Sequence, residues 1–375
     1  MRKKIALLLT LALAASSLAA CGGSKPAESA AATTAAAAET TAAAGDTKAA
    51  DTTAAAAEGE DPYAALGDFT MMVGHAQPEG NPRYVSMEKF AADVAEKTNG
   101  HVTVEVFANG QLGTEKEMLE QVVAGTVQGM RGGQFDFSPR LLMFTLPFLT
   151  QNRAQVTALL NSDLAKKVCT EAEAETGTVI ISLCDAGGYR QFSNSKHPIT
   201  KPEDLKGLKM RTNGMNTIDK TFIAMGATTT TIPYSDLYMG LKTSVADGQE
   251  NPWVNVEGMK FYEVQKYFTE VNYQFHPDPF YINAAWWNSL PAEYQEIIQE
   301  CADEMSVYND QLIDETQEAA KQVVVDAGCE VYEPSADELK AFQDAVQVVY
   351  DQCIEEGILT AEELKEMQDI VASAK

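Results

Sequence analysis

The sequence has few of the residues that build metal centres and disulfide frameworks. It contains four histidines and six cysteines in 375 residues. No two cysteines have CxxC spacing, and the number that follows Cys21 is odd, which argues against a structural zinc site and against a fully paired framework. We therefore expect mainly free, buried thiols, with one disulfide left open, at Cys169, Cys184, Cys301, Cys329 and Cys353.

The sequence also lacks the common catalytic and nucleotide-binding motifs. It has no HExxH, no GxSxG nucleophile elbow and no phosphate-binding loop. His75, in "VGHAQPEG" after the first expected strand, is the histidine best placed to line a cleft. The alternative is a hydrogen-bonded or exposed histidine. We predict no catalytic residue, no metal and no cofactor.

Basic residues are scarce relative to acidic ones. The chain has 28 Lys and Arg against 54 Asp and Glu, a formal charge of −26. This balance argues against nucleic acid as a partner and against membrane binding through a basic patch. It is compatible with an anionic ligand, because charges more than about 8 Å away are largely screened at physiological salt and nearby arginines set the local field.

The N-terminus has the pattern of a secretion signal. Arg2, Lys3 and Lys4 precede an apolar run at 5–13, which is too short to be a stable membrane span. Small residues then lead to Cys21, as in a bacterial lipobox, where this cysteine carries the lipid; the alternative is a chance cysteine. We predict a signal peptide at 1–20.

The region that follows, residues 21–66, is predicted to be a disordered tether. Residues 22–62 consist almost entirely of Ala, Thr, Glu, Gly, Ser and Asp, and this segment has too little apolar bulk to offset its ordering entropy. Roughly 40 residues of flexible chain reach about 35 Å. The simplest interpretation is a spacer between a membrane surface and a folded body.

Strands and helices alternate in the first part of that body. The runs 69–74, 101–107 and 178–184 are predicted strands, the last nearly continuous in apolar residues, as in a strand that is covered on both faces. Between them, a helix at 83–100 has a predicted buried face with i, i+3, i+4, i+7 spacing. A second helix begins near Thr114, which forms a capping box with Glu117.

A second block repeats the alternation. Thr200 and Glu203 fit a capping box that opens a short helix, and 208–211 and 228–234 are predicted strands. A helix is expected from Ser235 to a terminating Gly248, and one long amphipathic helix from Pro291 to about Ala327. Two α/β blocks and a long bridging helix indicate two α/β domains with a cleft between them.

Three polar side chains lie where ligands bind in open α/β sheets, beyond strand ends. Arg211 ends the strand "LKMR" and can offer two parallel hydrogen bonds to a carboxylate. Arg190 follows two glycines in "DAGGYRQFSNS", and Asn251 lies in "ADGQENPW". The alternative for Arg211 is a surface arginine, for Arg190 a hinge salt bridge, and for Asn251 a turn-forming asparagine.

Longer strings resemble the solute-binding subunit of TRAP (tripartite ATP-independent periplasmic) transporters, of the DctP type. The resemblance covers roughly residues 67–370. It is carried by "QLGTEKEMLEQVVAGTVQGM", "LPFL", "YRQFSNSKHPITKPEDLKGLKMR", "IPYSDLYMGLKTSVADGQENPWVNVEGMKFYEVQKYF" and "WWNSLPAEYQEIIQE". The most specific part is "ADGQENP" with the downstream "KFYEVQKY".

The resemblance implies a two-lobed, periplasmic-binding-protein-like α/β fold with a central cleft and a long hinge-spanning helix. Lobe I would comprise 67–187 and about 277–318, and lobe II 188–276 and about 319–375. Arg211 matches the family's signature arginine, which clamps the ligand carboxylate. Arg190 and Asn251 match the second arginine and the asparagine of that site, and Tyr234 matches an aromatic residue that packs on the ligand.

Two further matches concern the rest of the site. Glu117 matches a position where an acidic residue can serve the polar end of the ligand, although a capping box explains it equally well. The chain departs from the family pattern at "QGMRGGQFDFSPR", where Arg131 and Gln134 are candidates to reach the ligand. If Arg131 points inward, the ligand carries a second anionic group; if it points outward, Arg131 is a surface charge.

The resemblance implies that the protein captures a small organic acid outside the cytoplasm and delivers it to the small and large TRAP membrane subunits. The expected location is the periplasmic side or outer face of the cell membrane, with lipid attached at Cys21. Alternatives are a binding lipoprotein of an ATP-driven importer or of a sensory system and, less favoured, an enzyme acting on an organic acid.

Overall fold

The computed structural model describes residues 61–135 and 137–374. The predicted signal peptide (1–20), Cys21 and most of the predicted tether (21–66) lie outside the described residues. Among the described helices, none is both long and apolar enough to cross a membrane.

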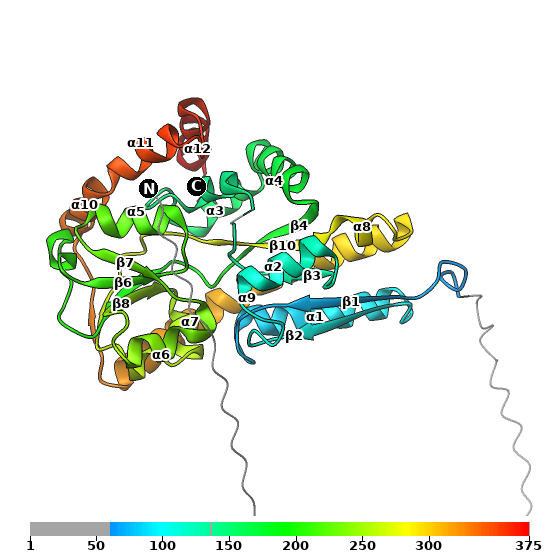
Figure 1. Ribbon diagram of the computed structural model, residues 1–375, viewed down its shortest axis with the longest axis horizontal. Helices are drawn as coiled ribbons and strands as arrows, with labels where there is room; N and C mark the ends of the chain where they lie inside the picture. Colours follow the sequence, from blue (N-terminus) through cyan, green and yellow to red (C-terminus); the bar gives the residue numbers. More distant parts are fainter. Residues whose placement is uncertain (1–60, 136, 375) are drawn as a thin grey trace, which may run out of the picture. The chain divides into compact units, whose positions relative to one another are not determined.

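The first sheet has five strands in the order β2-β1-β3-β10-β4 (Figure 1). β1 pairs in parallel with β2 and β3, whereas β10 enters from about 150 residues further along the chain and runs antiparallel to both β3 and β4. The predicted strands at 69–74, 101–107 and 178–184 are confirmed within one residue at each end. The strands are β1 (Phe69–Gly74), β2 (Val102–Phe107), β3 (Gly129–Arg131), β4 (Thr178–Asp185) and β10 (Pro277–Asn283).

The second sheet has six strands in the order β11-β9-β5-β8-β6-β7. β8 lies inside this sheet, antiparallel to β5 and parallel to β6. All four residues of β8 are buried, although their sequence is Gly-Gln-Glu-Asn. The strands are β5 (Gln191–Asn194), β6 (Lys209–Thr212), β7 (Thr228–Thr231), β8 (Gly248–Asn251), β9 (Tyr267–Thr269) and β11 (Glu330–Tyr332).

Helices cover both sheets, and one of them contacts elements of each. α9 packs on α1 and β4 beside the first sheet and on α7 beside the second (Figure 1), so it is the long bridging helix of a two-lobed α/β fold. The helices are α1 (Pro82–Lys97), α2 (Glu115–Ala124), α3 (Arg153–Leu160), α4 (Asp163–Thr176), α5 (Asn216–Ala224), α6 (Leu237–Lys242), α7 (Trp253–Gly258), α8 (Ala284–Trp287), α9 (Ala292–Asp326), α10 (Ala336–Ala345), α11 (Gln347–Glu355) and α12 (Ala361–Ser373). The 3₁₀ segments are η1 (Pro139–Thr145), η2 (Pro202–Leu205), η3 (Tyr234–Asp236) and η4 (Phe261–Glu263).

Local signals explain where the first helices begin. Asn81 caps α1 through a hydrogen bond from the Arg83 backbone N–H, and Pro82 occupies the first turn, where no N–H is needed. Thr114 and Glu117 form the predicted capping box of α2. Both helices therefore start just beyond the carboxyl ends of β1 and β2, at the edge where ligands bind in such folds.

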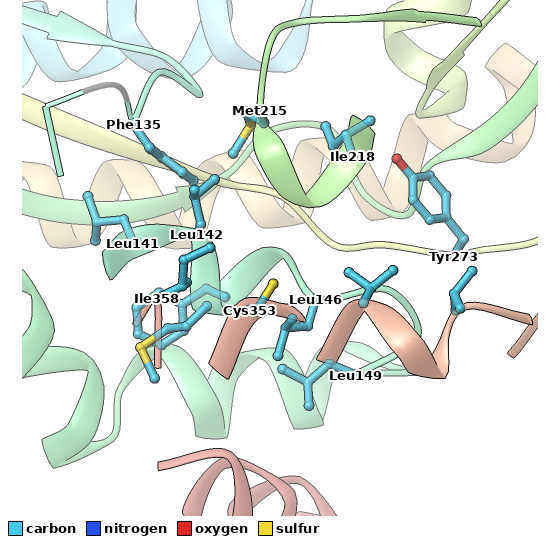
Figure 2. Packing of buried hydrophobic residues seen from close by; sticks show 14 of the residues in the cluster. Phe135, Leu141, Leu142, Leu146, Leu149, Met215, Ile218, Tyr273, Cys353 and Ile358 are labelled. Atoms are coloured by element: carbon cyan, nitrogen blue, oxygen red, sulfur yellow. The ribbon is translucent and has the colours of Figure 1, made fainter. Parts of the chain in front are cut away.

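A large apolar cluster joins segments that are far apart in the sequence. Figure 2 shows Leu141, Leu142 and Leu146 of the η1 segment with Met215 and Ile218 of the α5 region and residues near α11. Each fully buried side chain of this size contributes about 1.5–3 kcal/mol relative to exposure. The cluster thus fixes the loop after β3, α5 and the C-terminal helices to one another.

Two predictions for the second block were wrong in detail. The carboxylate that accepts hydrogen bonds from Thr200 belongs to Asp204, not Glu203, and the element is the 3₁₀ turn η2. The helix expected from Ser235 to Gly248 is α6, which ends at Lys242. Gly248 does not terminate a helix but begins β8, where an added Cβ would lie 2.4 Å from the Ser193 carbonyl oxygen.

The cysteines follow the expectation of free thiols. Cys184, Cys301 and Cys353 are buried, and Cys169 and Cys329 are partly buried; none of the five is in a disulfide.

Candidate functional site

One polar cavity collects side chains from elements of both sheets. Part of it is open to solvent, and it has about 350 Å³ of space that is not occupied by atoms. Its wall is almost entirely polar and includes three arginines. The lining residues are Gln77, Arg83, Glu115, Gly133, Ala186, Arg190, Arg211, Asn213, Tyr234, Asn251, Asn255, His276 and Asp278.

Arg211 is the least compensated charge in this wall. It lies on β6, is 1% exposed, and donates from Nε to the Ile232 carbonyl oxygen at 2.8 Å. Its Nη2 is buried and has no hydrogen-bond partner among the described residues. The pKa of Arg211 is lowered to about 10, chiefly by burial; Glu250 partly offsets this effect and Arg190 adds to it. An anion in the cavity would supply the missing partner.

Arg190, just before β5, is by contrast paired with a carboxylate. Its Nη2 donates to Glu250 Oε1 at 2.9 Å, its Nε also bonds the Glu250 carboxylate, and Tyr273 donates its hydroxyl to Glu250 Oε2 at 2.8 Å. Burial opposes the charge, but Glu250 outweighs it and raises the pKa of Arg190. Arg190 therefore lines the cavity as a charge held in position by a buried ion pair.

The amides of β8 complete this side of the site. Asn251 accepts a hydrogen bond from Arg190 Nη2 at 3.1 Å through its Oδ1 and donates to Gln249. Gln249 in turn donates to Ser193 Oγ at 2.8 Å. The polar residues of the buried strand thus satisfy one another and hold Asn251 against the second arginine.

Tyr234 connects the two sides of the cavity. Its hydroxyl donates to Gln77 Oε1 at 3.1 Å, and these residues follow strands of different sheets, β7 and β1. The ring packs edge-on against Phe261, with centroids 6.1 Å apart. Burial raises the pKa of Tyr234, so its hydroxyl stays protonated at neutral pH.

The opposite wall contains a charge cluster that sequence reasoning missed. Arg83, in the first turn of α1, pairs with Glu115 Oε1 at 3.1 Å from Nη1 and with the Asp278 carboxylate from Nη2. Asp278 lies on β10, and burial raises its pKa against the lowering effect of Arg83. The N-cap and Pro82 of α1 were the signals that could have placed Arg83 at the site edge.

His276 is a second missed lining residue. Neither of its ring nitrogens has a hydrogen-bond partner among the described residues. Its pKa is held well below 6.5 by burial and by the nearby charges of Arg190 and Arg83, so the ring is neutral at pH 7.

Two other predicted site residues lie outside the cavity wall. Glu117 is exposed, and its carboxylate is engaged by Thr114 in the capping box. It is Glu115, two residues earlier, that lines the cavity. Gln134 is 7% exposed but is not a lining residue, and its backbone carbonyl accepts from the Tyr281 hydroxyl at 3.0 Å.

Arg131 fits neither of the two predicted orientations. It is fully buried, so it is not a surface charge, and it does not line the cavity. Its guanidinium donates to Ser86 Oγ at 2.9 Å and to the Asp185 carbonyl oxygen at 3.1 Å. It therefore ties β3 to α1 and to the end of β4.

His75 lies behind the cavity wall and contacts the loop of Gln77. It is completely buried, and its Nδ1 accepts from the Gln77 backbone N–H at 3.2 Å. Burial, followed by the charges of Arg83 and Arg131, lowers its pKa well below 6.5. A neutral His75 thus positions the loop that carries Gln77.

Metal chemistry finds no support in the part of the chain that the structure describes. No group of three or more His, Cys, Asp or Glu side chains is placed to hold a metal ion there. A larger groove, with about 1340 Å³ of space that is not occupied by atoms, runs along α4, β4 and α9, but Lys166 in its wall is 70% exposed and pairs with Asp163. The polar cavity is the better candidate site because it contains a buried, unpaired guanidinium.

The charges of the cavity are suited to an anion. Its charged groups, together with Glu250 behind the wall, comprise three arginines and three carboxylates, and the arginine without a carboxylate partner faces the free space. A two-lobed α/β fold with such a site defines a ligand-binding protein for small acids.

The comparisons with known proteins agree with this class. The chain matches bacterial extracellular solute-binding protein family 7 (DctP) over residues 73–356 and belongs to that family. It is 31% identical to the C4-dicarboxylate-binding periplasmic protein DctP of Rhodobacter capsulatus over 75% of this chain and 85% of the relative. The protein is thus the solute-binding subunit of a TRAP transporter.

Solved structures of TRAP periplasmic solute-binding proteins share the fold. One from Desulfovibrio salexigens, with bound orotic acid, is 29% identical with a TM-score of 0.77, covering 81% of this chain and 98% of that chain. Another from Xanthobacter autotrophicus Py2, with bound β-D-galacturonate, is 28% identical with a TM-score of 0.74, covering 81% and 100%.

Proposed function

We propose that the carboxylate of a small organic acid binds in the polar cavity, with its oxygens on the Arg211 guanidinium. The observation that carries this proposal is the buried Nη2 of Arg211, which lacks a partner among the described residues. Arg190 and Asn251 adjoin the same space, and Tyr234 forms part of its wall. The acid is bound and released without chemical change.

The relatives support an acidic ligand. The Rhodobacter protein is named for C4-dicarboxylates, and the two related structures contain orotic acid and galacturonate. These ligands differ in size and shape but share a carboxylate. The shared group is the one that a planar guanidinium recognises through two parallel hydrogen bonds.

The proposed cycle is capture outside the cytoplasm, closure over the acid, and delivery to the small and large membrane subunits. A ligand that contacts both lobes stabilises the closed state through its higher affinity for that state. For the lobes we propose the predicted boundaries, 67–187 with about 277–318 and 188–276 with about 319–375. The distribution of strands between the two sheets supports them.

We further propose that Cys21 is lipidated after removal of residues 1–20, which anchors the protein to the extracytoplasmic face of the cell membrane. The support is the charged head, the short apolar run and the small residues before Cys21. Metabolic labelling with a palmitate analogue is expected to mark the protein but not Cys21→Ser; equal labelling would contradict the anchor.

Calorimetry tests the binding proposal directly. Titration with galacturonate, orotate and succinate should identify at least one acid that binds. For that acid, Arg211→Ala should weaken binding at least about 100-fold, because it removes the partner of a buried charge. Arg211→Lys should restore only part of the affinity, since the two-pronged geometry is lost.

Lys209→Ala is the matched control. Lys209 lies on the same strand, two residues before Arg211, and is exposed, so its loss should leave the affinity unchanged. Equal affinity of the Arg211→Ala variant and the unmodified protein would remove Arg211 from the site and overturn the proposal.

A further inference from the structure

We infer that the site selects a polyhydroxylated acid with a single carboxylate, and that Glu115 and Asp278 set its selectivity against dicarboxylates. This inference rests on the proposed function and specifies the class of ligand. The argument comes from the wall formed by α1, α2 and β10, which faces the same cavity as Arg211.

The charges of the two walls differ in sign. On the side of the second sheet, Arg190 is balanced by Glu250, so Arg211 leaves one uncompensated positive charge. Among the lining residues on the side of the first sheet, Arg83 is shared by Glu115 and Asp278, so the surface that faces the cavity has one carboxylate more than it has cations. Arg131, which is buried behind this surface, also acts on Asp278 but does not face the cavity. His276 adds no charge because burial keeps its ring neutral.

A second carboxylate on the ligand would therefore meet an unfavourable wall. One carboxylate of the ligand can pair with Arg211, but a second one would approach Glu115 and Asp278. Their common cation, Arg83, already has these two carboxylates as partners. Like charges within a few ångströms in a solvent-poor cavity repel strongly. This wall thus disfavours the compounds after which the Rhodobacter relative is named.

The same wall offers acceptors to hydroxyl groups. Both carboxylate oxygens of Asp278 are buried and lack a hydrogen-bond partner among the described residues, although one forms the ion pair with Arg83. A ligand hydroxyl is a donor that satisfies such an oxygen without adding charge. A buried acceptor left without a donor is costly, so an acid without hydroxyls would bind poorly.

The rest of the lining points to the same class. Of the thirteen described lining residues, Ala186 alone has an aliphatic side chain, whereas Gln77, Asn213 and Asn255 present amides. Amides donate to and accept from hydroxyl groups. An alkyl chain in this space would bury polar groups without replacing their hydrogen bonds, so the lining suits aldonates and uronates.

A ligand panel on the unmodified protein tests the inference. Calorimetry at pH 7.5 and fixed ionic strength would compare D-glucuronate, D-galacturonate and D-gluconate with succinate and with hexanoate, which has six carbons and no hydroxyl. We expect at least one hydroxylated monocarboxylate to bind at least about 100-fold more tightly than succinate and hexanoate.

Variants assign the selectivity to the two carboxylates. Glu115→Gln and Asp278→Asn should each weaken the best hydroxylated acid about 10-fold or more and reduce its advantage over succinate, because each removes a negative charge. Glu117→Gln is the matched control, because it makes the same change on the same helix at an exposed side chain. It should alter neither the affinity for the hydroxylated acid nor the advantage of that acid over succinate.

The outcomes separate this inference from the proposed function. Succinate or hexanoate binding as tightly as the best hydroxylated acid, with affinity still lost in Arg211→Ala, would overturn the inference and leave the acid site intact. Failure of every acid to bind would overturn both. Because the panel uses the unmodified protein, it decides the ligand class even if a variant does not fold.

Discussion

Arg211 and Arg190 show how the same residue type can have opposite effects on stability. Both guanidinium groups are buried in one cavity, but only Arg190 has a carboxylate partner, Glu250, among the described residues. Burial without a partner disfavours the charged form of Arg211, whereas the ion pair more than offsets burial at Arg190. The unpaired charge of Arg211 therefore favours binding of an acid but lowers the stability of the ligand-free fold.

This contrast predicts the stability of two matched variants. The pKa of Arg211 falls from 12.5 to about 10, which corresponds to a cost of about 3 kcal/mol for holding the charge. Arg211→Met should therefore raise the free energy of unfolding of the ligand-free protein by about 1–3 kcal/mol, after allowing for the lost bond to Ile232. Arg190→Met should lower it by about 3–5 kcal/mol, because it leaves Glu250 buried and unpaired.

Urea denaturation at pH 7.5 without added acid measures both effects. The two midpoints should move in opposite directions, and Arg211→Met should gain stability while losing the acid affinity measured by calorimetry. A loss of stability in both variants would contradict an unpaired Arg211, because it would show that the charge of Arg211 is compensated in the folded state.

At the scale of elements, hydrophobic pattern and capping chemistry predicted several strands and helices of the first block and the long helix α9. β1, β4, the capped start of α2 and the 35-residue α9 follow from periodicity, proline placement and capping residues. These are local signals, and the structure confirms them because tertiary packing agrees with them.

The strand β8 shows why the second block was harder to predict. Gly248 to Asn251 contain no apolar side chain, so no alternation marks them as a buried strand. Their polar groups are satisfied by partners distant in sequence, such as Ser193 and Arg190. Sequence patterns cannot show such partners, and a helix that continues to Gly248 was the natural local interpretation.

The residues of the candidate site also divide into those that the sequence predicted and those that it did not. Arg211, Arg190, Asn251 and Tyr234 were predictable because they lie in the strings that resemble the family, and the structure brings all four to one cavity. The wall of Arg83, Glu115 and Asp278 was not predictable. It forms only when β10 inserts between β3 and β4, which places Asp278 beside Arg83, at a helix start 195 positions earlier, and near Glu115.

At the scale of the whole molecule, the depth of the cavity requires movement. Arg211 and Asn251 are each 1% exposed although part of the cavity is open, and the Tyr234 hydroxyl donates to Gln77, which follows a strand of the other sheet. We expect that an organic acid cannot reach the Arg211 guanidinium while these contacts hold. The state that admits the ligand must therefore be more open than the one described here.

Small-angle scattering can detect this movement. The radius of gyration of the protein should decrease when a binding acid is added to saturation, because the ligand contacts both lobes and shifts the population toward the closed state. The Arg211→Ala variant is the control and should show no decrease at the same concentration of acid. Identical scattering curves with and without an acid that calorimetry shows to be bound would contradict closure. The acid would then reach Arg211 by local motion of the Tyr234 and Gln77 loops, without movement of one lobe relative to the other.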